Sequence, residues 1–372
     1  MAIFKRDGCV ALWHVLMILG CAILYGGWKL DATENINGIV AVKDDCSDVL
    51  VKYGAPGIDL DTPFLIGSLT KQFTGILAFQ HLGEVIDRDV GELLDEEEFQ
   101  SLLSDRAEWE KNSLWPELTL SHLSGVTVKQ LLHHRSKIDY FTGESLDEYR
   151  YQNLNFDLVG RVLEKRTGKT YEELARELFQ AAEMTGTFLG TDFPEREFLD
   201  KLKNSLIMVN RSPMLMKNPL TRGMNASGGI ISTAHDLLKW NEFLAVNGYF
   251  GKLSEFIANC YGNEYYGYGV VTDAKKNCFF HTGGLFLDDV PCPRAESSLD
   301  VAVLETGDGH SGGVLCVSFL LYDLETRFSA VGFDIIGNVP APRYQLMFPV
   351  GQLIMREIDE KIGQLLLRSV LP

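Results

Sequence analysis

Residues 66–73 read Ile-Gly-Ser-Leu-Thr-Lys-Gln-Phe, which places Ser68 and Lys71 three positions apart at the start of a long apolar run. Apolar residues recur in this run with the i, i+4, i+7, i+8 spacing of a helix that buries one face. Ser68 would then lie in the first turn, with Lys71 on the same face about one turn away. A serine needs a nearby base to act as a nucleophile, and a lysine can be that base when burial lowers its pKa. The pair therefore indicates nucleophilic catalysis, whereas the ordinary alternative is a capping serine followed by a surface lysine.

The composition is that of a large folded protein. The chain has 372 residues, of which 46% are hydrophobic and 10% aromatic, enough for a sizeable core with an inserted subdomain. Its net charge of −17 disfavours nucleic acid and anionic membrane surfaces as partners, and nothing in the composition sets an oligomeric state. The seven cysteines form no C-x-x-C motif and no zinc-like cluster with histidine, so we expect no metal and no cofactor. One disulfide could form among Cys260, Cys278, Cys292 and Cys316.

The N-terminal segment has the pattern of a membrane helix. Lys5 and Arg6 precede an apolar run over residues 8–28. A run of about 21 residues can cross a bilayer, and positive charge before it predicts a cytoplasmic N-terminus. We therefore expect residues 1–30 to be a membrane anchor or signal segment, and the rest to be exported, either held on the periplasmic or extracellular side or secreted. The alternative is a buried N-terminal helix of a cytosolic protein.

The remaining pattern predicts an α/β (α+β) fold, with an antiparallel sheet flanked by helices and an inserted all-α subdomain. Residues 38–43 and 49–54 read as a hairpin, and residues 83–225 are largely helical in pattern. Further β patterns occur at 266–271, 277–281, 299–304, 314–322 and 327–333, and a closing helix at 352–367. Residues 31–82 and 226–372 would then form the sheet domain, with 83–225 as the helical insertion.

Two consecutive histidines, His133 and His134, follow a short helical pattern that Thr127 caps. Consecutive residues of a helix do not face the same way, so we do not expect these two to bind a metal together. We expect a helix C-terminus at which the imidazoles interact favourably with the helix dipole.

Several short motifs follow one another along the chain. They are residues 66–73, Val128 to Leu132, Tyr151-Gln152-Asn153, Val159 to Tyr171, Ala226 to Leu237, Tyr266-Gly267-Tyr268-Gly269 and His281-Thr282-Gly283-Gly284. This ordered set resembles the serine β-lactamase-related family, which includes class C β-lactamases, D-alanyl-D-alanine carboxypeptidases and family VIII-type esterases. The resemblance covers roughly residues 35–335 and implies a β-lactamase/penicillin-binding-protein-like fold of bacterial type.

The resemblance implies a serine hydrolase that forms an acyl-enzyme on D-alanyl peptides of peptidoglycan, esters or β-lactams. Ser68 matches the nucleophile, and Lys71 its base or proton shuttle. Tyr151 would share the proton transfer, and Asn153 would contact Lys71 and the substrate amide. The ordinary interpretation of residues 151–153 is a helix-entry turn with a packed tyrosine.

The family's third motif has two candidates in this chain. His281, Thr282 and Gly283 match it, and His310 begins a second copy that the sequence leaves open. A glycine there permits close approach of a substrate strand, and backbone N–H groups of this strand and of Ser68 would form the oxyanion hole. The unusual region after His281 and the altered loop at residues 135–137 motivate an alternative, a catalytically inactive binding or scaffold protein on the same fold.

Overall fold

The structure is a computed structural model that describes residues 38–43, 49–106, 118–136, 138, 149–194, 197, 201–202, 220–261, 264–287 and 312–340. The expected anchor over residues 1–30, the strand at 299–304 and the helix at 352–367 lie outside these residues. Among the helices that are described, none is long and apolar enough to span a membrane.

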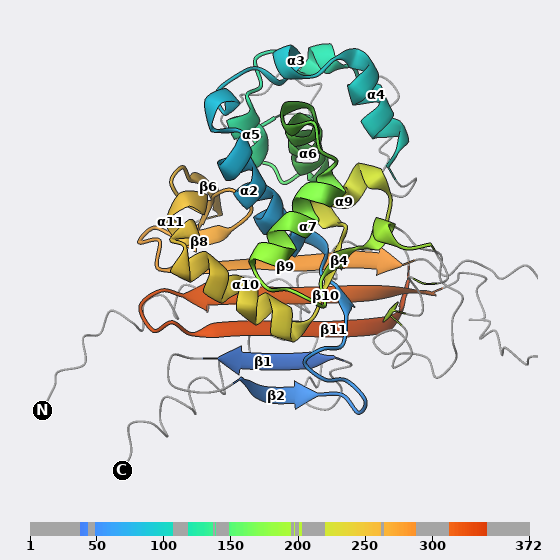
Figure 1. The fold of residues 1–372 in the computed structure, drawn as a ribbon, viewed down its shortest axis with the longest axis vertical. Helices are drawn as coiled ribbons and strands as arrows, with labels where there is room; N and C mark the ends of the chain where they lie inside the picture. The colour runs from blue at the N-terminus through green and yellow to red at the C-terminus, as the bar shows by residue number, and fades with distance from the viewer. Residues whose placement is uncertain are drawn as a thin grey trace, which may run out of the picture.

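A large antiparallel sheet forms the base of the molecule (Figure 1). Its eight strands follow the order β2-β1-β11-β10-β9-β8-β7-β6. Their bounds are β1 Ile39–Lys43, β2 Leu50–Gly54, β6 Ala258–Tyr261, β7 Glu264–Tyr266, β8 Val271–Asp273, β9 Cys278–Leu287, β10 Gly312–Asp323 and β11 Ser329–Pro340. The hairpin of β1 and β2 joins the sheet through β11, where Ile39 lies opposite Phe333. Segments from both ends of the chain thus share one sheet, and the predicted fold class is confirmed.

A second sheet of three strands lies at the start of the serine-bearing turn, just before the helix that carries Lys71. It consists of β3 (Phe64–Leu65), β5 (Ile230–Ser232) and β4 (Phe188–Leu189), in the order β3-β5-β4. The Ile66 N–H donates to the Ile230 carbonyl at 3.2 Å, which continues this pairing to the residue before Gly67. The small sheet therefore fixes where the serine-bearing turn begins.

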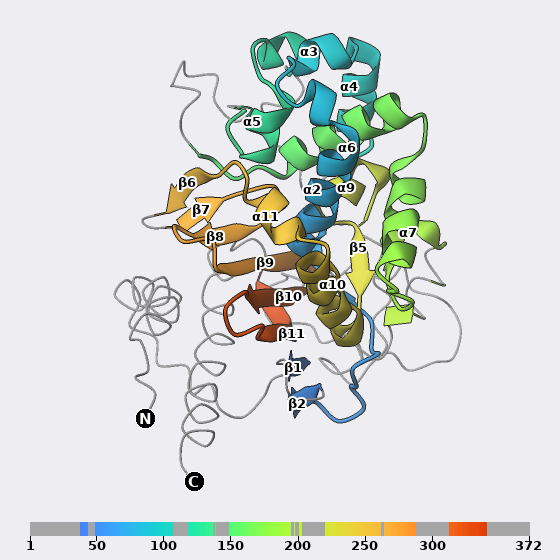
Figure 2. The same cartoon turned by 60° about the vertical axis from the view of Figure 1, so that its left-hand side comes forward.

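Helices cover one face of the large sheet and extend above it (Figures 1 and 2). Their bounds are α2 Thr70–His81, α3 Val90–Leu93, α4 Glu96–Ser104, α5 Val128–Leu132, α6 Asn153–Thr167, α7 Tyr171–Ala181, α9 Asn225–Gly228, α10 Ala234–Val246 and α11 Tyr249–Leu253. Helix α10 packs on β10, β11 and β1, whereas α3, α4 and α5 lie farther from the sheet. The division of the chain into a sheet domain and a helical insertion stays a prediction.

Helix α2 runs through the middle of the molecule and contacts α6, α7, α9 and α11. Every residue from Thr70 to Ala78 is buried, as expected for a helix that is enclosed on all sides. Phe73 stacks on Trp240 with ring centres 4.1 Å apart, and the Trp240 indole donates to Gln72 at 3.1 Å. These contacts hold α2 against α10, and with it the position of Lys71.

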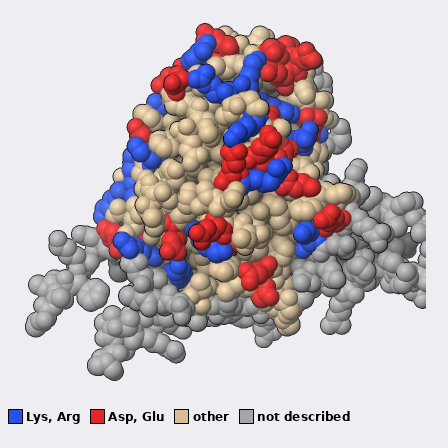
Figure 3. Space-filling view, viewed as in Figure 1, with Lys and Arg blue, Asp and Glu red and all other residues tan. Residues whose placement is uncertain are grey.

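The helical part of the surface carries both signs of charge (Figure 3). Lys165 pairs with Glu98 at 2.6 Å, and Lys169 with Glu177 at 2.7 Å. Asp95 and Glu98 cap α4 reciprocally, so part of the acidic run at residues 95–98 stabilises a helix start. The face in Figure 3 therefore has no extended basic surface of the kind that binds nucleic acid.

Candidate active site

Ser68 lies in the 3₁₀ turn η1 (Gly67–Leu69), directly before α2. The expectation of a serine inside the first α-helical turn is therefore slightly wrong, because α2 begins at Thr70. The predicted proximity holds: the Lys71 amine donates to the Ser68 hydroxyl at 3.1 Å. Ser68 is partly exposed and Lys71 is fully buried, which rules out the surface-lysine alternative.

The Lys71 amine joins three distant parts of the chain. Besides Ser68 Oγ, it donates to Asn153 Oδ1 at 2.7 Å and to the Ser227 carbonyl at 2.8 Å. An ammonium has three N–H groups, and these three acceptors are all neutral oxygens. Segments that carry Ser68, Asn153 and Ser227 therefore meet at one nitrogen atom.

Tyr151 lies just before α6, which begins at Asn153. The Lys71 amine is 4.8 Å from the centre of the Tyr151 ring, and the Tyr151 side chain is partly exposed. The helix-entry interpretation of residues 151–153 is thus correct as local structure. The same turn also brings Tyr151 and Asn153 to Lys71.

Strand β9 runs directly beside η1. A Cβ added to Gly283 would collide with the Ile66 carbonyl, and one added to Gly67 would lie 2.9 Å from the Gly284 nitrogen. The Ser318 hydroxyl of β10 donates to the same Ile66 carbonyl at 2.7 Å. Strand β8 pairs with β9 only at Phe279 and Phe280, so among the described strands residues 281–287 are paired on one side, by β10.

His281 is buried in β9 with both ring nitrogens engaged. Its Nε2 lies 3.0 Å from the Tyr266 hydroxyl and its Nδ1 lies 2.6 Å from the Thr282 carbonyl. Since a carbonyl only accepts, Nδ1 carries the proton and Nε2 accepts from Tyr266. Burial, assisted by the Lys71 charge, lowers the pKa of His281 to about 3. The imidazole is therefore neutral at pH 7; Thr282 is exposed, and His310 lies outside the described residues.

The expected helix C-terminus is confirmed, since α5 ends at Leu132 with His133 as its C-cap, but the expected dipole interaction of His133 and His134 is wrong. Both side chains are buried, and desolvation lowers the pKa of His133 to about 4 and the pKa of His134 well below its usual value. His133 bonds the Phe256 carbonyl through Nε2 at 2.9 Å. Neutral imidazoles gain nothing from a helix dipole, and the sequence could not reveal that both would be covered.

Two contributors to the site were not assigned a role from the sequence. The Ser227 carbonyl is a backbone group, so no residue type announces it. His134 contacts Tyr151 at 4.4 Å between ring centres, and the only signals near it were the pair of consecutive histidines and the altered loop at residues 135–137.

Metal and disulfide chemistry find no support in the described part of the chain. No group of three or more potential ligands lies close enough there to hold a metal ion. No disulfide joins Cys260, Cys278 and Cys316 to one another, and Cys292 lies outside the described residues.

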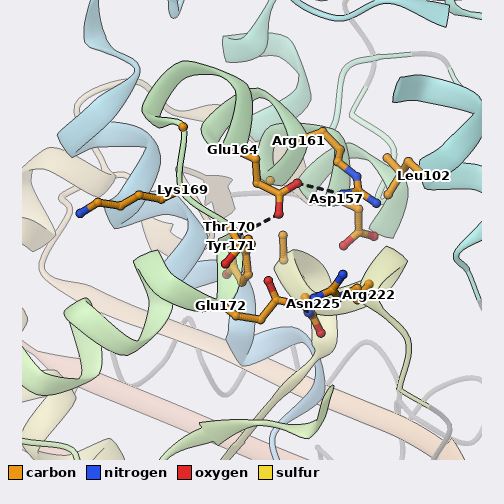
Figure 4. A pocket seen from close by; sticks show the side chains of 13 residues that line it. Leu102, Asp157, Arg161, Glu164, Lys169, Thr170, Tyr171, Glu172, Arg222 and Asn225 are labelled. Carbon is orange, nitrogen blue, oxygen red and sulfur yellow. Dashed lines mark hydrogen bonds and ion pairs between the residues drawn. The ribbon is translucent and has the colours of Figure 1, made fainter. Parts of the chain in front are cut away.

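A separate polar cavity of about 360 Å³ lies between α6, the start of α7 and α9 (Figure 4). Its polar side chains bond one another: Arg161 donates to Glu164 at 2.9 Å, and the Asn225 amide donates to Glu172 at 2.9 Å. The Tyr171 hydroxyl, bonded to Thr74 at 2.7 Å, belongs to its wall. None of Ser68, Lys71 and Tyr151 lines this cavity, so it is distinct from the serine–lysine site.

Comparison with known proteins now decides the family. The β-lactamase family model matches residues 30–287. The chain belongs to the β-lactamase family of serine hydrolases. The resemblance inferred from the ordered motifs is thereby confirmed, although a search of curated proteins gives no match.

Several solved structures share the fold of this chain. D-amino acid amidase from Ochrobactrum anthropi SV3 has a TM-score of 0.54 at 17% identity, covering 95% of this chain and 99% of that one. A penicillin-binding protein homologue from Pyrococcus abyssi has a TM-score of 0.51 at 15% identity, covering 92% and 77%. A β-lactamase/D-alanine carboxypeptidase from Yersinia pestis has a TM-score of 0.50 at 16% identity, covering 92% and 99%. At these identities the likeness concerns the fold alone.

Proposed function

We propose that this protein hydrolyses amide or ester bonds through an acyl-Ser68 intermediate. The observation that carries the proposal is the buried Lys71 amine, which lies within hydrogen-bond distance of Ser68 Oγ, Asn153 Oδ1 and the Ser227 carbonyl. A nucleophile, its base and a group that orients the base are the parts that nucleophilic catalysis needs.

Proton transfer from Ser68 has two routes in this geometry. Burial disfavours a charged lysine, so a neutral Lys71 can take the serine proton itself. Alternatively Tyr151 acts as a phenolate, which a Lys71 ammonium beside its ring would stabilise. In either case the proton passes afterwards to the leaving group, and the exposed ring of Tyr151 supports a role for this residue in that step.

The strand beside Ser68 supplies the rest of the chemistry. The backbone nitrogens of Ser68 and Gly284 are the groups we assign to the oxyanion hole, because a Cβ on Gly67, the residue before Ser68, would lie 2.9 Å from the Gly284 nitrogen. A substrate lying along residues 281–287 would add a strand to β9 and meet the exposed Thr282. Attack by Ser68 Oγ on the substrate carbonyl then gives the tetrahedral intermediate, and departure of the amine or alcohol gives the acyl-enzyme.

Among the substrates that the family suggests, His281 favours those with an uncharged leaving group. A neutral imidazole with both nitrogens engaged offers no positive charge to a terminal carboxylate. Small esters and amides therefore fit this strand better than D-alanyl peptides or β-lactams, both of which carry a carboxylate. The solved D-amino acid amidase, which shares the fold, was crystallised with L-phenylalanine amide, a small amide of this kind.

Labelling with a fluorescent fluorophosphonate, which carries no carboxylate, tests the nucleophile directly. We expect wild-type protein and the exposed-serine control Ser124→Ala to label equally, and Ser68→Ala to lose the label. Labelling that persists unchanged in Ser68→Ala refutes the assignment. A fluorescent penicillin in the same assay should label more slowly than the fluorophosphonate.

One observation favours the inactive alternative. If Lys71 is an ammonium and all three of its N–H groups donate hydrogen bonds, it has no lone pair and cannot act as a base. A binding or scaffold protein would keep such a lysine permanently charged. Folded wild-type protein that reacts with neither probe supports that alternative over the hydrolase.

Export of the protein is part of the proposal and does not depend on which of these substrates is used. The apolar run over residues 8–28 supports an anchor. Carbonate extraction of membranes from expressing cells distinguishes the two cases: an anchored protein stays with the membranes and a soluble one is released.

A further inference from the structure

His134 accepts hydrogen bonds from the residues on both sides of Tyr151. Its carbonyl accepts the Arg150 N–H at 2.8 Å, and its Nδ1 accepts the Gln152 N–H at 3.2 Å. Its ring also lies against the Tyr151 ring, with centres 4.4 Å apart. The residues before and after the tyrosine, and the tyrosine itself, thus contact one histidine.

The backbone of His134 is in the left-handed region, with φ +54°. A residue other than glycine seldom adopts this conformation, and it persists where the surrounding structure requires it. Here it allows the carbonyl and the side chain of one residue to bond two N–H groups that flank Tyr151. The strained position therefore has a local consequence at the proposed active site.

The hydrogen bonds also fix the form of the ring. Nδ1 receives the Gln152 N–H and the Asn155 amide, both at 3.2 Å, so it is an acceptor and the proton is on Nε2. Asn155 is oriented in turn by the Ser136 hydroxyl, which donates to its Oδ1 at 2.5 Å. Burial, assisted by the charge of Lys71 from α2, lowers the pKa of His134 well below its usual value and keeps the ring neutral.

We propose that His134 is a positioning residue that sets the phenol of Tyr151 beside the Lys71 amine. It acts through Tyr151 and touches no reacting atom. The inference rests on the proposed function, because it assigns Tyr151 a part in proton transfer. The competing explanation is a buried ring that only fills space among Tyr149, Phe156 and Tyr266.

A double-mutant cycle separates the two explanations. His134→Gly removes the side chain, and glycine adopts positive φ without strain, so the carbonyl bond to Arg150 can remain. We expect His134→Gly to slow fluorophosphonate acylation of Ser68 by about 10-fold, less than the roughly 100-fold or more expected for losing an acid–base group outright, because the phenol is displaced and not removed. In a Tyr151→Phe background the same change should slow it by less than about twofold, because the contribution that His134 positions is already gone. An equal loss in both backgrounds overturns the proposal.

Two further variants keep the test decisive if Tyr151→Phe is too slow to measure. His134→Asn tolerates positive φ and keeps an acceptor near the place of Nδ1, so it should recover most of the rate lost in His134→Gly. His133→Asn is the matched control: it removes the adjacent buried imidazole, which bonds Phe256, and should lower the melting temperature without slowing acylation. Failure of His134→Asn to recover the rate, or an equal slowing in His133→Asn, contradicts the inference.

Failure of this inference differs from failure of the proposed function. Persistent labelling of Ser68→Ala removes the function and the inference together. Loss of that label, combined with equal effects of His134→Gly in both backgrounds, removes only the role of His134. Near-ultraviolet circular dichroism of each variant ensures that rates are compared between folded proteins.

Discussion

Two buried cations bind neighbouring turns of α6, and the comparison separates chemistry from architecture. Lys71 donates to Asn153 and to the Ser227 carbonyl, whereas Arg106 pairs with Asp157 and donates to the Gly223 carbonyl at 3.0 Å. Asn153 and Asp157 lie four residues apart on one helix, so they differ mainly in whether an amide or a carboxylate meets the cation.

The difference decides how firmly each charge is held. A carboxylate beside a buried cation stabilises the charged form, and an arginine cannot lose its proton in any case. Asn153 is neutral, so the Lys71 proton is held by hydrogen bonds without an opposite charge from that side chain. We therefore interpret the Arg106–Asp157 pair as a structural ion pair. At the Lys71 site, in contrast, the lysine can give up its proton.

Replacement of Lys71 should have the largest effect on activity. Lys71→Ala removes the proposed base and should slow acylation of Ser68 by at least about 100-fold, with the fold intact. Lys71→Arg keeps a positive charge that cannot act as a base and should be just as slow. Fluorophosphonate labelling rates measure both variants. Near-normal labelling of Lys71→Arg would mean that only the charge matters, which contradicts Lys71 as the base.

Replacement of Arg106 should have the opposite profile, a large loss of stability with little change in chemistry. Arg106→Met leaves the buried Asp157 carboxylate without its cation, which should cost about 3–5 kcal/mol of unfolding free energy. Urea denaturation measures the loss, and labelling of the folded fraction should stay within about twofold of wild type. The double variant Arg106→Met with Asp157→Leu should regain most of the stability. A slowing of acylation as large as that of Lys71→Ala contradicts the division of roles.

Asn153→Asp places a carboxylate beside Lys71, as Asp157 does beside Arg106. An opposite charge at this distance raises a lysine pKa by about 1–3 units, so acylation at pH 7 should slow by roughly 10-fold or more. Activity should return as the pH is raised, because the neutral amine is then recovered. The pH–rate profile measures this shift, and Asn153→Ala, which adds no charge, should slow the reaction without moving the profile. An unmoved profile in Asn153→Asp argues for the phenolate route through Tyr151.

The sequence could reveal the parts of this site that depend on residue type and spacing. Ser68 and Lys71 share a face because they are three apart, and the hairpin of residues 39–54 follows from its β-rich runs. Strand β9 continues to Leu287, beyond its predicted end at 281, because it pairs along its length with β10. Such pairing is set by residues far away in the chain and leaves little local signal.

The contacts that complete the site could not be predicted for a different reason. The Ser227 acceptor is a carbonyl, which every residue has, and its role depends on where α9 packs. His133 and His134 resemble an exposed helix end until the surrounding elements cover them. Sequence reasoning identified which side chains can do the chemistry, whereas burial and backbone acceptors, which tune that chemistry, depend on the packed structure.

The smallest expected effect is that of each single histidine around these cations. Burial lowers the pKa of His133 to about 4 and of His281 to about 3, and the charge of Lys71 contributes at His281 and His134, whereas Arg106 contributes at none of the three. Between these values and about 6.5 the unfolded chain binds protons that the folded protein does not, so stability falls as the pH is lowered. Each histidine should remove roughly 1.4 kcal/mol per pH unit below 6.5. Urea denaturation at pH 7, 6 and 5 measures the slope, and His133→Asn should reduce it by one histidine's share. Stability that stays constant over this range would mean that the three imidazoles accept protons in the folded state. That result would contradict the neutral forms of His134 and His281 on which the proposed roles of these two residues depend.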